Sequence, residues 1–233
     1  MTGSVCLQGG GEFSAGCRPM DADLLRRAPG RVAVSALAGA VGRDYASATA
    51  NGVGHYRALG APDVVAAPDA RQDEPGAVAA LRGARLVVLP GGSPSRLLHA
   101  LRTTAVGDLL RTLLSDGVLL MGSSAGAMVL CPWTVLPDDQ DGPSARPGLG
   151  LVAGLLVVPH WTGPAGRGDW LDAAGSSVPA GTEVLGIPEE SGVLVEGSVL
   201  TALGRAATTL VTTGRSLEPG EQWDVRQSGE DAR

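Results

Sequence analysis

Short hydrophobic runs alternate along the first half of the chain with segments whose apolar residues recur at helical spacing. The runs predict strands at residues 4–8, 31–35, 63–67, 85–89 and 118–121. The helical spacing predicts helices at residues 21–28, 44–59, 74–81, 95–101 and 105–115. Regular alternation of strand and helix indicates an α/β protein with parallel strands joined by right-handed crossovers. In such sheets ligands bind outside the carboxyl ends of the strands, where the glycine-rich turns of this chain also fall.

The second half of the chain has a different pattern. Residues 132–150 are polar and too numerous for a simple connection, so we expect a lid there. The pattern then predicts a strand at 155–158, a helix at 167–174, a strand at 184–187 and an antiparallel meander at 193–195, 199–203 and 208–211. We expect residues 1–220 to form a single domain and residues 221–233 to form a loose polar tail.

Composition narrows the functional classes. Aromatic residues make up only 3% of the chain, so Leu, Val and Ala must form the core, which suits parallel strands covered by helices. The net charge of −6 argues against a nucleic-acid or anionic-membrane partner. The three cysteines lack metal-ligand spacing, and we expect neither a metal nor an organic cofactor. No leader-like or membrane-spanning stretch is evident, which predicts a cytoplasmic protein, either a monomer or a homodimer.

The segment from Gly122 to Gly126 carries the pattern G-x-S-x-G directly after a buried strand. In a nucleophile elbow this pattern presents a serine, here Ser124, at the tip of a sharp strand-to-helix turn. Both glycines are needed because a Cβ at either position would crowd the turn or the neighbouring strand. The alternative interpretation is an ordinary glycine-serine loop at the end of a strand.

A serine nucleophile needs a base and a group that orients the base. Of the three histidines, His55 and His99 lie within predicted helices, whereas His160 directly follows a buried strand, on the sheet edge where the elbow is expected. Glu189 follows the next strand and is the candidate acid. The alternatives are three aspartates of the polar loop, Asp138, Asp139 and Asp141.

Backbone N–H donors for an oxyanion are expected beside the elbow. Gly91 and Gly92 end the strand that should neighbour the Ser124 strand, and Ala125 follows the serine. The order serine, histidine, acid differs from the serine, acid, histidine order of α/β-hydrolases, which disfavours an ordinary lipase or esterase.

Taken together, these segments resemble the serine peptidases that include peptidase E, an aspartyl dipeptidase, and cyanophycinase. The resemblance lies in Gly9–Glu12, Leu89–Gly92, Gly122–Ala127, Val158–Trp161 and Gly186–Glu189, in the family's order and over nearly the whole chain. It implies a flavodoxin-like three-layer α/β/α sandwich of the class-I glutamine-amidotransferase type. It also implies Ser124 as nucleophile, His160 as base, Glu189 as acid, and Gly92 and Ala125 as oxyanion donors.

The resemblance further implies a serine peptidase acting on short peptides, with a preference for an N-terminal acidic residue. An arginine downstream of the histidine holds the acidic side chain in peptidase E-like members, and Arg167 is the candidate here; a solvated residue at a helix start is the alternative. Near the position after Gly91-Gly92 the family usually has Asn, Asp or Gln, whereas Ser93-Pro94 follows here; Ser93 is the second candidate for substrate binding. The alternatives are a hydrolase or acyl-transfer enzyme for non-peptide amides or esters, and a non-catalytic binding homologue.

Overall fold

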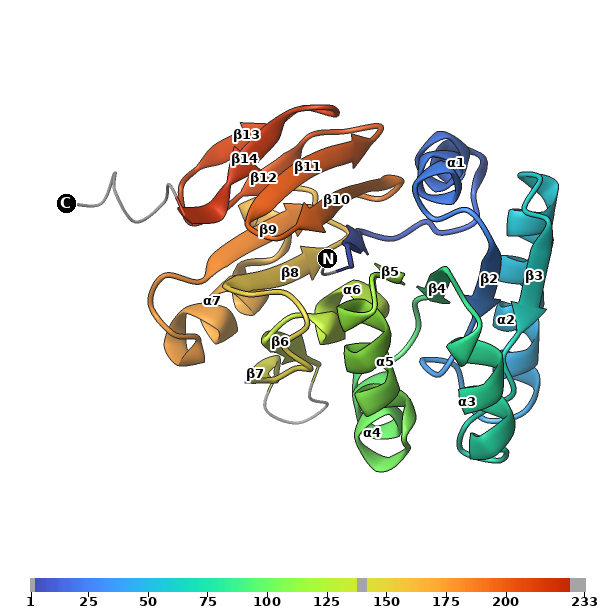
Figure 1. Ribbon diagram of the computed structural model, residues 1–233. Helices are drawn as coiled ribbons and strands as arrows, with labels where there is room; N and C mark the ends of the chain where they lie inside the picture. Colours follow the sequence, from blue (N-terminus) through green and yellow to red (C-terminus); the bar gives the residue numbers. More distant parts are fainter. Residues whose placement is uncertain (1–2, 138–141, 227–233) are drawn as a thin grey trace.

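The protein is described by a computed structural model that covers residues 3–137 and 142–226. Figure 1 shows its central feature, a large twisted sheet. In order across this sheet the strands are β14 (Gln222–Asp224), β11 (Val199–Gly204), β10 (Ser191–Glu196), β1 (Val5–Gln8), β5 (Leu119–Ser123), β4 (Leu86–Leu89), β2 (Arg31–Val34) and β3 (Asp63–Ala66). On one side of β1, the neighbouring strands β5, β4, β2 and β3 all pair in parallel. On its other side, β10, β11 and β14 pair antiparallel. The predicted parallel strands are therefore confirmed.

A smaller sheet lies beside the large one (Figure 1). Its strands, in spatial order, are β13 (Arg215–Leu217), β12 (Thr208–Leu210), β9 (Glu183–Ile187) and β8 (Leu155–Pro159). Only β8 and β9 pair in parallel. A two-stranded hairpin of β6 (Trp133–Leu136) and β7 (Ser144–Pro147) packs near this sheet.

Helices cover both faces of the large sheet. Along β4, Leu86 and Val88 pack with the side of α1 (Arg18–Arg27) and α2 (Arg43–Ala58), while Val87 and Leu89 face the opposite layer. Alternate residues of a strand point to opposite faces, so a continuous apolar run is what a strand buried on both sides requires. The opposite layer contains α3 (Glu74–Arg82), α4 (Pro94–Thr103), α5 (Val106–Ser115) and α6 (Ala125–Leu130). The result is the predicted α/β/α sandwich, and α7 (Gly168–Ser177) packs against the β6–β7 hairpin.

Several details differ from the sequence-based expectations. The C-terminal antiparallel strands are divided between the two sheets: β10 extends the large sheet through β1, whereas β12 pairs with β9. The polar stretch at 132–150 contains the β6–β7 hairpin, and its residues 138–141 lie outside the described chain. The expected loose tail does not begin at residue 221, because β14 pairs with β11 and buries Trp223. Residues 227–233 are outside the description.

Candidate active site

Ser124 lies at the junction between β5 and α6, as the elbow pattern predicts. Its backbone has φ 47° and ψ −107°, a strained conformation for a residue with a side chain. A methyl group on Gly122 would come within 2.5 Å of the Gly126 backbone, and one on Gly126 within 2.3 Å of the Leu89 carbonyl oxygen. The two glycines therefore allow α6 to pack closely against β5 and β4.

The side chains of Ser124, His160 and Glu189 form a continuous hydrogen-bonded chain. Ser124 Oγ lies 2.9 Å from His160 Nε2, and His160 Nδ1 lies 2.9 Å from Glu189 Oε1. With a neutral imidazole, the arrangement assigns the ring proton to Nδ1, donated to the carboxylate, and leaves Nε2 as acceptor for the serine hydroxyl. The pair formed by His160 and Glu189 is open to water, with 62% of the Glu189 side chain exposed.

The sequence predicted that His160 follows a strand of the same sheet as the elbow. This prediction is wrong, because β8, the strand before His160, belongs to the smaller sheet. The turn after β1 joins the two sheets. Three consecutive carbonyls of this turn, those of Gln8, Gly9 and Gly10, accept the backbone N–H groups of Ser124, His160 and Glu190 at 2.8–2.9 Å. Main-chain hydrogen bonds from one short segment thus fix all three triad-bearing turns.

Close approach explains the glycines of this turn. A methyl group on Gly9 would lie 2.2 Å from the carbonyl oxygens of Ile187 and Pro188. One on Gly10 would lie 2.4 Å from His160 Cε1, and the φ of Gly10, 129°, is also unfavourable for other residues. Gly10 consequently packs directly against the imidazole, and Gly9 packs against the backbone that precedes Glu189.

The side chain of Glu12 links the Gly9–Glu12 segment to the carboxyl ends of β4 and β5. Its Oε1 accepts the Gly91 N–H at 2.7 Å, and its Oε2 accepts the Ser123 hydroxyl at 2.9 Å. Sequence reasoning noted Glu12 only as part of a motif. It missed these contacts because residues 12, 91 and 123 become neighbours only when the strand ends converge.

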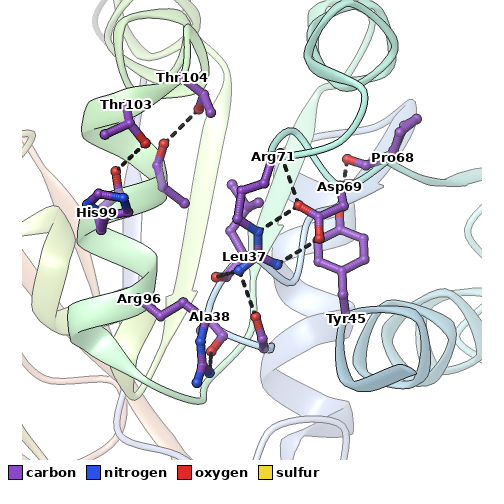
Figure 2. Close-up of polar contacts among 12 residues, drawn as sticks. Leu37, Ala38, Tyr45, Pro68, Asp69, Arg71, Arg96, His99, Thr103 and Thr104 are labelled. Carbon is purple, nitrogen blue, oxygen red and sulfur yellow. Dashed lines mark hydrogen bonds and ion pairs between the residues drawn. The ribbon is translucent and has the colours of Figure 1, made fainter. Parts of the chain in front are cut away.

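The loop after β2 supports the Gly91–Ser93 turn from the opposite direction. The Ala38 carbonyl accepts the Ser93 N–H at 3.1 Å and the Arg96 guanidinium at 2.9 Å. Figure 2 shows that Arg71 holds the same loop through the Leu37 carbonyl while pairing with Asp69. The backbone beside the site is therefore anchored by buried and half-buried polar groups.

Two backbone N–H groups remain as candidate donors to a ligand. In the described residues, the N–H groups of Gly92 and Ala125 have no hydrogen-bond acceptor in the protein. Ala125 begins α6, where the first N–H groups of a helix have no intrahelical partner. The predicted adjacency of the strands holds, since β4 pairs with β5.

The two residues predicted to contact substrate have contacts within the protein. Ser93 Oγ accepts the Arg96 N–H at 3.2 Å and so caps α4. Arg167 precedes α7, and its guanidinium lies 5.3 Å from the centre of the Trp170 ring. Among the described residues it forms no ion pair.

The remaining candidates lie elsewhere. His55 is buried against Asp21, with 2.7 Å between Nε2 and Oδ2, and burial raises the pKa of Asp21 despite this contact. His99 is exposed on α4 (Figure 2).

Glu190, next to the candidate acid, is bound elsewhere. Its carboxylate accepts hydrogen bonds from Ser14 and Arg205, and these contacts lower its pKa. The alternative acids Asp138, Asp139 and Asp141 lie outside the described residues.

The described part of the chain contains no cluster of His, Cys, Asp and Glu side chains suited to a metal ion. It also contains no helix with the length and hydrophobicity needed to span a bilayer.

The family model described as peptidase family S51 matches residues 37–203, most of the chain, including the elbow, His160 and Glu189. The chain belongs to peptidase family S51. This is a family of serine peptidases, in agreement with the predicted resemblance. A similar protein, the peptidase E of Nostoc sp. (strain PCC 7120 / SAG 25.82 / UTEX 2576), is 28% identical over 148 residues. The match covers 59% of this chain and only 60% of the Nostoc protein.

Two solved structures have a fold similar to that of this chain. A peptidase from an acI-B1 Actinobacterium superposes with a TM-score of 0.80 at 23% identity, covering 96% of this chain and 97% of the other. A putative peptidase E protein from Listeria monocytogenes EGD-e superposes with a TM-score of 0.61 at 16% identity, covering 88% of this chain and all of the other. At these identities the likeness establishes the architecture.

Proposed function

We propose that this protein is a serine peptidase that hydrolyses short peptides through an acyl-enzyme, using Ser124, His160 and Glu189. The observation that carries the proposal is the pair of 2.9 Å contacts linking Ser124 Oγ to His160 and His160 to Glu189, with the serine on a strained elbow. A serine hydroxyl is a weak nucleophile unless an oriented base takes its proton. This geometry favours catalysis over a binding role.

In the proposed reaction, Ser124 Oγ attacks the scissile carbonyl carbon as its proton passes to His160 Nε2. The developing oxyanion accepts hydrogen bonds from the N–H groups of Gly92 and Ala125. Collapse of the tetrahedral intermediate breaks the C–N bond, and His160 donates its proton to the departing amine. A water molecule then attacks the Ser124 ester as His160 takes its proton, and His160 returns that proton to Ser124 Oγ as the ester bond breaks and the acid leaves.

Glu189 orients the imidazole and stabilises the imidazolium that forms during each proton transfer. Its carboxylate needs no proton of its own for this role. Because the pair is open to water, the charge of Glu189 is screened, and its contribution rests on orientation more than on electrostatic attraction.

For substrate choice, we propose a preference for peptides with an N-terminal acidic residue, held by Arg167. Support comes from this guanidinium, which follows His160 in the chain and lies on Trp170 without a carboxylate partner among the described residues. A guanidinium can bind a carboxylate through two parallel hydrogen bonds, which gives geometric selectivity. Arg167→Ala should therefore raise KM for acidic N-termini and leave neutral N-termini unaffected.

The test combines a neutral fluorophosphonate probe with a panel of short peptides that differ at the N-terminal residue. Wild type should be labelled at Ser124 and should release N-terminal Asp, as measured by mass spectrometry. Ser124→Ala should lose labelling and reduce turnover by about 10⁴-fold or more, since triad members act as a unit. A folded Ser124→Ala protein with normal turnover would rule out the mechanism. Labelling without cleavage of any peptide would support a non-peptide amide or ester as substrate.

A further inference from the structure

Glu12 is a carboxylate at the site that the triad chemistry does not use. It is bound to two groups that belong to different strand ends: the Gly91 N–H, after β4, and the Ser123 hydroxyl, at the end of β5. Ser123 is fully buried and directly precedes the nucleophile. Glu12 thus bridges the glycine turn to the strand that carries Ser124.

The bridge lies next to the reacting serine. A methyl group at Gly91 would come within 2.8 Å of Glu12 Oε1 and 3.3 Å of Ser124 Cβ, so the carboxylate and the nucleophile border the same small space. Glu12 also lines an open groove of about 590 Å³, with Phe13, Asn51 and His55 on its walls.

Three successive backbone N–H groups of the glycine turn, those of residues 91–93, differ in their hydrogen-bond acceptors. Gly91 donates to Glu12, and Ser93 donates to the Ala38 carbonyl at 3.1 Å. Between them, the Gly92 N–H has no acceptor among the described residues. Glycine has more backbone freedom than any other residue, so a Gly91–Gly92 pair held only on its Ser93 side would sample more orientations of that N–H. Stabilisation of an oxyanion depends on donors that are already aimed before the reaction.

We propose that Glu12 is a positioning residue that holds the Gly91–Gly92 turn against the Ser124 strand, so that the Gly92 N–H points at the oxyanion. The inference rests on the proposed function, in which Ser124 is the nucleophile and Gly92 a donor. Glu12 acts through its hydrogen bonds, and its negative charge is not required. Substrate contact by Glu12 is not required either.

Two substitutions separate the hydrogen bonds from the charge. In Glu12→Gln, Oε1 can still accept the Gly91 N–H, and the amide N–H can donate to Ser123 Oγ, because a hydroxyl also accepts. Both links survive without the charge. Glu12→Ala removes both links. Glu218→Ala, at an exposed position in the β13–β14 turn, is the matched control for loss of a glutamate side chain.

The measurement is the rate of Ser124 labelling by a neutral fluorophosphonate, with the maximal rate and the apparent affinity determined separately and thermal unfolding recorded for every variant. This probe needs the nucleophile and the oxyanion donors but carries no ammonium group. Glu12→Ala should lower the maximal rate by about 10²-fold, comparable to loss of one oxyanion donor. Its apparent affinity should change less than about threefold. Glu12→Gln and Glu218→Ala should stay within about fivefold of wild type.

Other results would overturn the inference. Wild-type labelling of a folded Glu12→Ala protein would exclude positioning while leaving Ser124 as nucleophile. Equal losses in Glu12→Gln and Glu12→Ala would show that the charge matters. Normal labelling of both variants, combined with raised KM for peptides that have a free N-terminus, would identify Glu12 as a binding group for the substrate ammonium. Failure of wild type itself to be labelled would refute the proposed function, and this inference with it.

Discussion

Replacing Gly10 by alanine tests whether the turn after β1 sets the position of the catalytic imidazole. The new methyl group would lie 2.4 Å from His160 Cε1 and 2.7 Å from Nδ1, whereas ordinary contacts begin near 3.4 Å. The ring must therefore move by about 1 Å, and a misplacement of that size can cost about 10²-fold in rate. This corresponds to about 2.7 kcal/mol of transition-state stabilisation.

The same substitution also strains the backbone, because Gly10 has a φ of 129°. Strain of this kind costs about 1–3 kcal/mol of stability. Gly11→Ala separates the two effects. Gly11 also has a positive φ, 69°, but its methyl group would first meet the flexible Glu190 side chain, at 3.3 Å. Gly11→Ala should therefore lose stability while keeping its turnover within about threefold of wild type.

The assay compares kcat on a cleaved peptide, or the rate of fluorophosphonate labelling, with the free energy of unfolding from denaturant titration. Gly10→Ala should lose both rate and stability, and Gly11→Ala chiefly stability. Equal rates for the two variants would refute the reasoning, whether both were slow or both normal. In that case the imidazole position would not depend on the space left by Gly10.

Three further predictions follow from the same structure. Glu189→Gln should reduce kcat by about 10- to 100-fold, less than Ser124→Ala, because water already screens this exposed carboxylate; a larger loss would contradict that account. Burial raises the pKa of Asp21 above its ordinary value of 3.8, so its contribution to stability is present below that pH and is lost as pH rises through the folded-state pKa. Urea unfolding should show wild type losing stability relative to Asp21→Asn as pH increases, and a constant difference would refute the assignment. Burial raises the pKa of the Cys131 thiol to about 12, so a thiol reagent at pH 8 should modify it only after unfolding; rapid native-state modification would show that the site opens.

The three catalytic candidates illustrate how far sequence reasoning reached. Ser124 was recognisable because G-x-S-x-G encodes a local conformation, and the glycines that permit it lie two residues before and two residues after the serine. His160 and Glu189 were recognisable because each follows a hydrophobic run that predicts a strand end. The geometry brings all three together, although the sheet assignment for His160 was wrong. Periodicity identifies strands but contains no information on which strands pair.

Other features were not predictable in this way. The contacts of Glu12 with Gly91 and Ser123 join segments about 80 and 110 residues distant in sequence, and no local pattern encodes them. The capping role of Ser93 is an exception, because a serine before a proline is a local helix-start signal that sequence reasoning overlooked. The strand at 222–224 was missed because a short polar segment carries little hydrophobic pattern, and only its pairing with β11 orders it.

The sequence by itself determined the α/β class, the parallel strands, the elbow and the residues available for catalysis, because these depend on local spacing and on hydrophobic periodicity. Only the tertiary structure decided how the large and small sheets meet, and therefore how Ser124 finds its base. Part of that meeting is a pair of main-chain hydrogen bonds in which the carbonyls of Gly9 and Gly10, after β1, accept the backbone N–H groups of His160 and Glu190. Such contacts arise from the convergence of strand ends in space, and the order of residues along the chain does not reveal them.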